Sequence, residues 1–507
     1  MARPDRSLPI FVVLIFGAAF ATLVPSFYGA AVRDYDSARV FFYCGLLFAI
    51  AAGLLWLAVA PTARSGTEQR YLLTLLLSYL WLPGILAVPM IQLRADLALI
   101  DVYFDMVSAL TTTGAAVFAP ERLTDTAHLW RATVGWFGGA LIWLTALAVL
   151  APLNLGGFEV TAEAGSGPQG AGSSHRGQIG AVTASGRLYR HVVVLFPVYL
   201  GLTIVLAIAL TLAGERPLHA VIHAMSTLST SGISAVGGPK DGSAGVIGEL
   251  LIVLFFVFAL TRRSFSGGFG PRWPGIMARD RELRLALIIV AALSAFLFVR
   301  HGVGAYRLDA LEDGPAAVAA FWGALFTVLS FLTTTGFVSD SWALAGTWSG
   351  LPMPGLVLVA MVIIGGGVAT TAGGLKLLRV YALYKHGTRE IDRLVHPHSV
   401  AGAGRMGRRI REEGAYIAWI FFMLLLVTIG VVTLALSATG LGFEAALIFA
   451  IAGLATAGPL VEVAGQVPLS YGALGDAAKL VLVVAMIIGR VETLVFLAVF
   501  NPAFWRA

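Results

Sequence analysis

Long apolar blocks alternate with short polar segments along this chain, and many of the blocks are long enough to cross a bilayer. About 20 apolar residues cover the hydrocarbon core of a membrane. The blocks predict ten spanning helices, near residues 8–28, 38–61, 70–92, 127–151, 190–213, 245–262, 283–300, 352–385, 414–437 and 477–500. The first block lacks a small-residue cleavage pattern, so it predicts a retained helix and not a signal peptide.

Four shorter apolar segments, near 98–112, 217–230, 316–334 and 444–456, are too short or too polar to span comfortably. Each ends in small or hydroxylated residues followed by one glycine. A membrane tolerates such non-helical backbone only where protein buries it or where it lines a water-filled cavity. These segments therefore predict re-entrant helices that enter the membrane and return to the same side.

The turns that close the short segments repeat, and a repeat defines the architectural unit. They read Ser-Ala-Leu-Thr-Thr-Thr-Gly at 108–114, Ser-Thr-Leu-Ser-Thr-Ser-Gly at 226–232, Ser-Phe-Leu-Thr-Thr-Thr-Gly at 330–336 and Ala-Gly-Leu-Ala-Thr-Ala-Gly at 452–458. We therefore divide the chain into an N-terminal helix pair (1–62), pore repeat 1 (63–158), a Gly/Ser-rich cytoplasmic linker (159–187), pore repeat 2 (188–280), pore repeat 3 with a broken helix (281–395) and pore repeat 4 (396–507).

Composition places the chain in the membrane class. Of its 507 residues, 58% are hydrophobic and 12% are charged, against roughly 25% charged in soluble domains. The net charge of +6 comes from basic residues gathered in a few loops, which sets topology and does not indicate nucleic-acid binding. The single cysteine, Cys44, excludes an intramolecular disulfide and a cysteine-based metal cluster.

Loop charges predict the orientation. Six basic residues lie between 262 and 284 and nine between 376 and 411, whereas the opposite segments hold few. The positive-inside rule then places both termini in the cytoplasm, with all four turns entered from outside. Two G-x-G-x-x-G matches, at 165–170 and 402–407, follow no strand and so predict loops, not a dinucleotide site.

The eighth spanning segment is interrupted by glycines and hydroxyls between 365 and 374. Consecutive glycines break a helix, and the freed backbone groups need water or protein partners. Close helix packing through small residues is the alternative explanation. We interpret the break as an unwound gate loop on the conduction path. The gate candidates are Gly365, Gly366, Gly367, Thr370, Thr371, Gly373, Gly374 and Arg490.

The four turns carry the candidate chemistry. Glycine permits backbone angles that point successive carbonyls towards one axis, and a ring of carbonyls replaces the hydration shell of a monovalent cation. Four packing turns in a helical bundle are the alternative. The candidate filter residues are Thr112, Thr113, Gly114, Thr230, Ser231, Gly232, Thr334, Thr335, Gly336, Thr456, Ala457 and Gly458.

At these residues the chain resembles the Trk/Ktr/HKT superfamily of potassium transporters, and within it the bacterial TrkH-type subunit. The resemblance rests on 111–114, 333–337, the break at 365–374, Ile488-Gly489-Arg490-Val491-Glu492 and the closing Asn501-Pro502-Ala503-Phe504-Trp505. It implies K⁺ uptake through a single pore in the bacterial inner (plasma) membrane, with filter glycines at Gly114, Gly232, Gly336 and Gly458. It also implies a homodimer surrounded by lipid, and a cytosolic ring of TrkA-like nucleotide-binding subunits. K⁺ is then the transported ion, and no organic cofactor belongs to this chain.

The chain departs from that family in the fourth turn, Thr456-Ala457-Gly458, and in the break, Ala369-Thr370-Thr371-Ala372. Family members usually carry asparagine and a bulkier residue in the first, and Gly-Ser-Thr-Gly in the second. Glycine at 114, where Na⁺-favouring members carry serine, points to K⁺.

Several ionisable residues lie inside apolar segments. Arg490 predicts a pore-facing gate charge, or alternatively a salt bridge with Glu492 or another acid. Asp105 and Glu444 could stabilise helix N-termini or the back of the filter. His219 and His223, spaced i, i+4, could bind zinc, but no further ligand is evident.

The sequence thus predicts an all-α integral membrane protein: ten transmembrane helices and four re-entrant pore helices, in four helix–pore–helix repeats around a pseudo-fourfold K⁺ pore. No acid/base pair, nucleophile elbow or phosphate loop occurs in suitable context, so we expect no enzyme. Two alternatives stay open: a secondary transporter with alternating access, whose repeats are usually inverted, and a non-conducting membrane scaffold.

Overall fold

The computed structural model describes residues 10–59, 68–94, 96–147, 184–261, 273–305, 314–351, 353–396 and 412–492. Within these ranges all regular secondary structure is helical, as the apolar pattern predicts. Seven described helices are long and apolar enough to cross a membrane. The number of ten spanning helices stays a prediction.

The helices follow the repeat pattern. The N-terminal unit has α1 (Ile10–Ala21), α2 (Leu23–Ala31) and α3 (Tyr35–Val59). The first repeat has α4 (Glu68–Leu93), α5 (Leu99–Leu110) and α6 (Asp125–Thr145). The second has α8 (Ala184–Leu212), α9 (Pro217–Ser229), α10 (Gly245–Phe255), α11 (Val257–Leu260) and α13 (Trp273–Ala278). The third has α14 (Arg281–Ala305), α15 (Gly314–Leu332), α16 (Trp342–Ser349), α17 (Gly355–Ile364) and α18 (Leu377–Val395). The fourth has α19 (Glu412–Ala438), α20 (Phe443–Leu454), α21 (Leu460–Val463) and α22 (Asp476–Val491).

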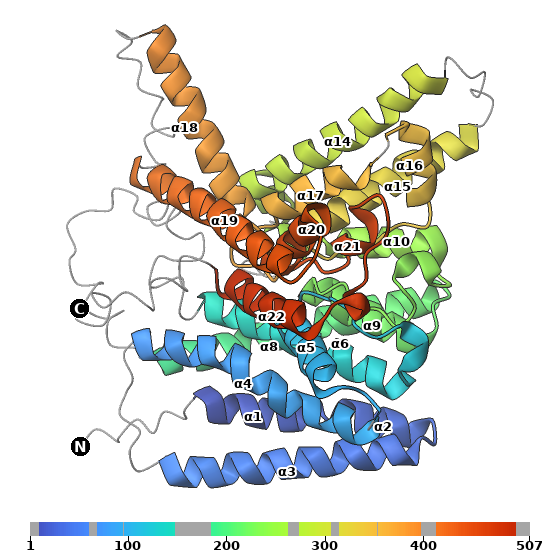
Figure 1. The fold of residues 1–507 in the computed structure, drawn as a ribbon, viewed down its shortest axis with the longest axis vertical. Coiled ribbons are helices and arrows are strands. Elements are labelled where there is room, and N and C mark those ends of the chain that lie inside the picture. The colour runs from blue at the N-terminus through green and yellow to red at the C-terminus, as the bar shows by residue number, and fades with distance from the viewer. Residues whose placement is uncertain are drawn as a thin grey trace.

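Helix contacts close the four repeats into a ring. Repeat 1 meets repeat 2 through α6 and α9, repeat 2 meets repeat 3 through α10 and α15, and repeat 3 meets repeat 4 through α17 and α20. Contacts between α22 and α5 complete the circuit. In Figure 1, α5, α9 and α20 lie in the middle of the molecule, α1–α3 stack along one side, and α18 projects from the opposite side.

Burial separates the short helices from the outer ones. In α5, eight of 12 residues are buried, so this short helix belongs to the core. In α3, Leu47 is 56% exposed and Leu54 is 63% exposed. An apolar helix face of this kind, left open to the surroundings, fits contact with lipid.

Several expected boundaries are wrong. The first span runs over Ile10–Ala31, with a local irregularity at Thr22 between α1 and α2. The 245–262 segment is the shorter apolar stretch Gly245–Leu260, with a similar irregularity at Phe256 between α10 and α11. The 352–385 span is two helices, α17 and α18, separated by the expected break. The short segment at 316–334 is a 19-residue helix, and its apolar part is long enough to span.

Other expectations fall partly or wholly outside the described residues. The last four residues of the expected 159–187 linker belong to α8, and the rest lies outside the described ranges. Both G-x-G-x-x-G segments and the closing 501–505 segment also lie outside them. The final helix, expected to reach 500, ends at Val491, where Glu492 takes a φ of 67°.

Candidate functional site

The four helices that precede the repeated glycines, α5, α9, α15 and α20, end in the same hydrogen-bonded turn. In repeat 1, Thr113 N–H donates to the Ser108 carbonyl (2.8 Å) and Thr112 N–H to the Ala109 carbonyl (2.9 Å). Equivalent pairs of bonds close repeats 2, 3 and 4. This is the Schellman pattern, in which the residue after the helix C-cap adopts a left-handed conformation. We call residues 111–114, 229–232, 333–336 and 455–458 the four turns.

Threonine occupies the left-handed position of every turn, where glycine is the usual residue. The φ angles are 54° at Thr112, 53° at Thr230, 57° at Thr334 and 52° at Thr456. A β-branched residue costs on the order of 1–2 kcal/mol in this conformation. The same strain in all four repeats indicates that the threonine side chain has a use at this position.

Hydroxyl groups pair across three of the turns. Thr111 Oγ1 lies 2.8 Å from Thr113 Oγ1, and Thr333 Oγ1 lies 3.0 Å from Thr335 Oγ1. In the second turn Ser229 Oγ donates to Ser231 Oγ at 2.9 Å. The fourth turn has alanines at both positions, Ala455 and Ala457. The fourth turn therefore lacks this internal hydroxyl bridge.

The turns contact one another in cyclic order. A Cβ added to Gly114 would overlap the carbonyl oxygen of Ser231, and a Cβ added to Gly232 would overlap that of Thr335. These glycines also have positive φ angles, 73° at Gly114 and 65° at Gly232. Glycine is required twice over, by backbone angle and by the close approach of the next repeat.

The fourth turn joins this ring differently. Gly458 N–H donates to the Thr113 carbonyl at 2.6 Å, and Gly458 lacks the positive φ of the other turn glycines. At Gly336 (φ 82°), a Cβ would lie 2.9 Å from Cγ of Pro459 and not against a carbonyl. The ring is thus pseudo-fourfold, with its irregularity at the junction of repeats 3 and 4.

Two threonine hydroxyls in the ring have no hydrogen-bond partner in the part of the chain that the structure describes. Thr112 Oγ1 and Thr456 Oγ1 are buried without a hydrogen bond among the described residues. Buried polar atoms normally have a partner, and an exception calls for an explanation. Carbonyl and hydroxyl oxygens gathered in this way can coordinate a cation that has shed its water.

The break expected at 365–374 extends over residues 365–376 in the structure, between α17 and α18, and packs directly against the turns. Gly373 N–H donates to Thr334 Oγ1 (2.8 Å), and Thr371 Oγ1 donates to the Leu228 carbonyl at the end of α9 (3.1 Å). A Cβ on Gly373 would overlap the Ala455 carbonyl, which leaves room for glycine alone. The break is therefore an ordered loop whose backbone and hydroxyl groups are satisfied by three different repeats.

Arg490 holds the centre of that loop. Its Nη1 donates to the Thr371 carbonyl at 2.7 Å, while Nε and Nη2 have no partner among the described residues. The alternative of an Arg490–Glu492 salt bridge is wrong. Glu492 binds Arg379 instead, at 2.8 Å, because the helix ends at Val491 and Glu492 turns away from Arg490.

A carboxylate also reaches the loop from α14. Glu282 accepts a hydrogen bond from Val368 N–H at 2.9 Å. Lys376, at the end of the loop, is buried, and its ammonium group donates a hydrogen bond to the Ala372 carbonyl. Together these bonds fix the loop at both ends.

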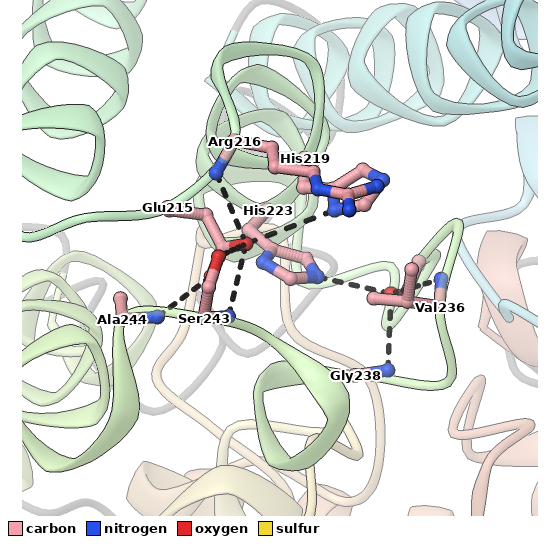
Figure 2. Close-up of polar contacts among 9 residues, drawn as sticks. Glu215, Arg216, His219, His223, Val236, Gly238, Ser243 and Ala244 are labelled. Carbon is pink, nitrogen blue, oxygen red and sulfur yellow. Dashed lines mark hydrogen bonds and ion pairs between the residues drawn. The ribbon is translucent and has the colours of Figure 1, made fainter.

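Polar side chains brace the segments that flank the second turn, as Figure 2 shows. Glu215 accepts hydrogen bonds from Ser243 N–H (3.3 Å), Ser243 Oγ (3.2 Å) and Ala244 N–H (3.4 Å). Burial alone would raise the Glu215 pKa, but these hydrogen bonds and the electrostatic effect of nearby His223 together outweigh it and hold the pKa below its usual value. The loop before α9 is therefore tied to the start of α10.

The two histidines of α9 are part of this brace, and zinc has no support from the described residues. His219 Nδ1 lies 3.7 Å from Glu215 Oε1. His223 Nε2 lies 2.9 Å from Ser234 Oγ, which also accepts N–H bonds from Val236 and Gly238 (Figure 2). No group of three potential metal-ligating side chains occurs in the described part of the chain.

Other carboxylates brace the remaining repeats. Asp105 does not lie at a helix N-terminus, as one alternative held; it lies inside α5 and pairs with Arg131 at 2.8 Å, with both side chains buried. Glu444 does occupy the first turn of α20. Asp101, on α5, pairs with Lys479, on α22, which joins repeat 1 to repeat 4.

Sequence reasoning missed two residues that touch the site's surroundings. Glu249, on α10, accepts bonds from Trp322 Nε1 (2.6 Å) and Ser339 Oγ (2.9 Å) and so holds the segment after the third turn. Tyr471 donates its hydroxyl to the Gly458 carbonyl at 3.1 Å. No motif marks either residue; an acid in an apolar helix was the one available signal for Glu249.

Comparison with known proteins agrees with this architecture. The family model described as TrkH, cation transport protein, matches residues 283–506. The Trk system potassium uptake protein TrkH of Vibrio parahaemolyticus is 31% identical over 426 residues, covering 81% of each chain. The protein of the same name from Escherichia coli is 28% identical and covers 99% of this chain and 98% of its own. The crystal structure of the potassium transporter TrkH from Vibrio parahaemolyticus superimposes with a TM-score of 0.78 at 26% identity, covering 99% of this chain and all of that one.

Proposed function

Because this chain belongs to the TrkH family of cation transport proteins, we propose that it carries K⁺ into the bacterial cell through the ring formed by its four turns. The family is a transporter family, and the chain is not an enzyme. The relatives are named as potassium uptake proteins, which supports K⁺ as the transported ion. The several membrane-length helices support a multi-pass protein of the inner membrane.

One observation carries the proposal: three of the four turns present the carbonyl before their glycine to the glycine of the neighbouring repeat. Carbonyl oxygens in a ring replace the water around a dehydrated cation. The unpartnered hydroxyls of Thr112 and Thr456 add two further oxygens. The filter is the set of residues at 112–114, 230–232, 334–336 and 456–458.

The direction of these contacts favours a pore over alternating access. The turn carbonyl of repeat 2 faces the glycine of repeat 1, that of repeat 3 faces the glycine of repeat 2, and that of repeat 1 faces the glycine of repeat 4. All three contacts therefore have the same sense around the ring. Inverted repeats, the usual basis of alternating access, would reverse this sense between halves. We therefore assign a single channel-like pore.

The loop at 365–376 is the gate in this proposal. It lies against the ends of the turns and Arg490 binds its Thr371 carbonyl. An arginine here repels cations and also latches the loop. The gate opens when the loop leaves Arg490. We assign control of that movement to a cytosolic nucleotide-binding partner ring of the TrkA type acting on a homodimer, with both chain termini in the cytoplasm.

Uptake of ⁸⁶Rb⁺ into liposomes that contain the purified protein tests the proposal. External K⁺ should compete with the tracer strongly and Na⁺ weakly. In Gly336→Ser, the added side chain would meet Pro459, so Na⁺ should compete better. Equal competition by K⁺ and Na⁺ in the parent protein would contradict a K⁺-selective ring. Absence of tracer uptake in the presence of the cytosolic partner would contradict transport itself and favour a scaffold.

A further inference from the structure

We propose that Tyr471 is a positioning residue of the filter: its hydroxyl turns the Gly458 carbonyl away from the pore and so lowers selectivity for K⁺. The proposal rests on the proposed function of the four turns. Tyr471 begins a short 3-10 turn, Tyr471–Ala473, between α21 and α22. It is only 4% exposed, and its hydroxyl donates to the Gly458 carbonyl at 3.1 Å.

Aromatic packing fixes where this hydroxyl points. The Tyr471 ring lies 5.7 Å from the Phe104 ring on α5 and 5.1 Å from the Phe449 ring on α20. It is therefore wedged between the pore helices of repeats 1 and 4, behind the fourth turn. A carbonyl that bonds to this hydroxyl faces the pore helices and not the ring.

The backbone of Gly458 supports the same conclusion independently. The other turn glycines have φ angles of 73°, 65° and 82°, whereas Gly458 is not among the residues with positive φ. A different φ rotates the peptide groups on either side, so the fourth turn presents its carbonyls in another direction. Pro459 contributes, because a residue before proline is driven towards extended conformations.

The hydrogen bond also weakens the oxygen as a ligand. The Gly458 carbonyl accepts bonds from the Tyr471 hydroxyl (3.1 Å) and from Val461 N–H (3.3 Å), so both of its lone pairs are occupied. Across the ring, the Thr113 carbonyl accepts a hydrogen bond from Gly458 N–H, so one of its lone pairs is occupied. The Thr113 carbonyl keeps a second lone pair that can face the ion, whereas the Gly458 carbonyl has none. Field strength and number of carbonyl ligands govern K⁺ over Na⁺ selectivity.

Tyr471→Phe removes the hydroxyl and keeps the ring between Phe104 and Phe449. We expect the Na⁺ concentration that halves ⁸⁶Rb⁺ uptake, divided by the corresponding K⁺ concentration, to rise about threefold. The Gly458 carbonyl is then held only by the longer bond from Val461 N–H (3.3 Å), so it can turn towards the ion more easily. K⁺ should also raise the melting temperature of the detergent-purified variant at a lower concentration than for the parent protein. A purely structural role would lower the melting temperature without K⁺ and leave both K⁺ responses unchanged.

Tyr103→Phe is the matched control. Tyr103 lies on α5, the helix that leads into the first turn, and its hydroxyl donates a hydrogen bond to the backbone carbonyl of Leu80 at 2.7 Å. That carbonyl belongs to α4 and not to a turn, so the inhibition ratio should match the parent protein. If Tyr471→Phe takes up ⁸⁶Rb⁺ but its inhibition ratio is unchanged or lower, the role of Tyr471 is overturned and the proposed function is not. Failure of the parent protein to take up ⁸⁶Rb⁺ overturns the proposed function instead.

Discussion

Repeats 1 to 3 and repeat 4 build the same helix end with different chemistry. All four turns share the Schellman bonds and a left-handed threonine. The first three add a hydroxyl pair, at 2.8, 2.9 and 3.0 Å, and a glycine with positive φ. The fourth has neither, and it is held from behind by Tyr471 and from the side by Thr113.

The difference separates what shapes the ring from what tunes it. The helix end and the left-handed threonine are common to all repeats, so they set the position of each turn. Hydroxyl pairs and glycine φ angles vary, so they set how firmly and in which direction each turn presents its oxygens. We infer that three turns form a rigid binding surface and that the fourth turn determines how selective it is.

Alanine at Gly232 should have the largest effect and break the ring itself. The new Cβ would overlap the Thr335 carbonyl at a φ of 65°. Overlap and strain together cost about 3 kcal/mol, so ⁸⁶Rb⁺ uptake should fall about a hundredfold. Gly453→Ala is the control, because the nearest atom to its Cβ is Leu482 Cδ2 at an ordinary 3.5 Å. Equal losses in both variants would contradict the ring.

Arg490→Gln should have the next largest effect. It tests the contact by which repeat 4 holds the loop at 365–376. Loss of the 2.7 Å bond to the Thr371 carbonyl removes about 1.5–3 kcal/mol of charge-assisted bonding. Basal ⁸⁶Rb⁺ uptake without the cytosolic partner should rise roughly tenfold. The ratio of the Na⁺ and K⁺ concentrations that halve ⁸⁶Rb⁺ uptake should stay constant, because Arg490 contacts the loop and not the turns. A change in that ratio with constant basal uptake would contradict the gate assignment.

Thr113→Val sharpens the comparison by removing from repeat 1 the hydroxyl pair that repeat 4 lacks. Valine keeps the shape but removes the 2.8 Å partner of Thr111, which should destabilise the protein by about 1 kcal/mol. Thermal unfolding in detergent measures this loss. The reverse change, Ala455→Ser with Ala457→Ser, should stabilise the fourth turn by a similar amount. A destabilising effect of the added serines would contradict a shared hydroxyl geometry.

The smallest expected effect is a pH dependence of stability caused by Glu215. This carboxylate ties the loop before α9 to the start of α10 in repeat 2. Its pKa is lowered in the folded protein, so its stabilisation is present above the unfolded value of about 4.3. That stabilisation is lost as the pH falls through the lower folded value. Glu215→Gln should therefore flatten the melting temperature profile below about pH 4.5. Asp36→Asn is the control, because that carboxylate is 92% exposed. Identical profiles for Glu215→Gln and the parent protein would contradict the brace.

Much of this architecture could be predicted from the sequence because it rests on strong local patterns. Apolar length marks spanning helices, and a glycine after hydroxylated residues marks each turn. The glycines at 365–374 marked the loop correctly for the same reason. These signals are contiguous in the chain, so no three-dimensional information is needed to see them.

The remaining features depend on residues that meet only in three dimensions. Arg379 and Glu492 are 113 positions apart, so the sequence suggests only the neighbouring Arg490 as an alternative partner for Glu492 and gives no sign of Arg379. Tyr471 lies 13 residues after its carbonyl partner in a segment without a repeating pattern. Left-handed threonines were equally hidden, because the conformation normally selects glycine.

Anomalous diffraction from crystals grown in Rb⁺ tests the central claim most directly, because Rb⁺ replaces K⁺ and its position can be located without transport. The account predicts an anomalous peak on the axis of the ring, within coordination distance of carbonyls from the turns that contain Gly114, Gly232 and Gly336. The fourth turn should lie farther from the ion, and it should approach in Tyr471→Phe. A peak outside the ring of turns, or equal coordination by all four turns in the parent protein, would contradict it.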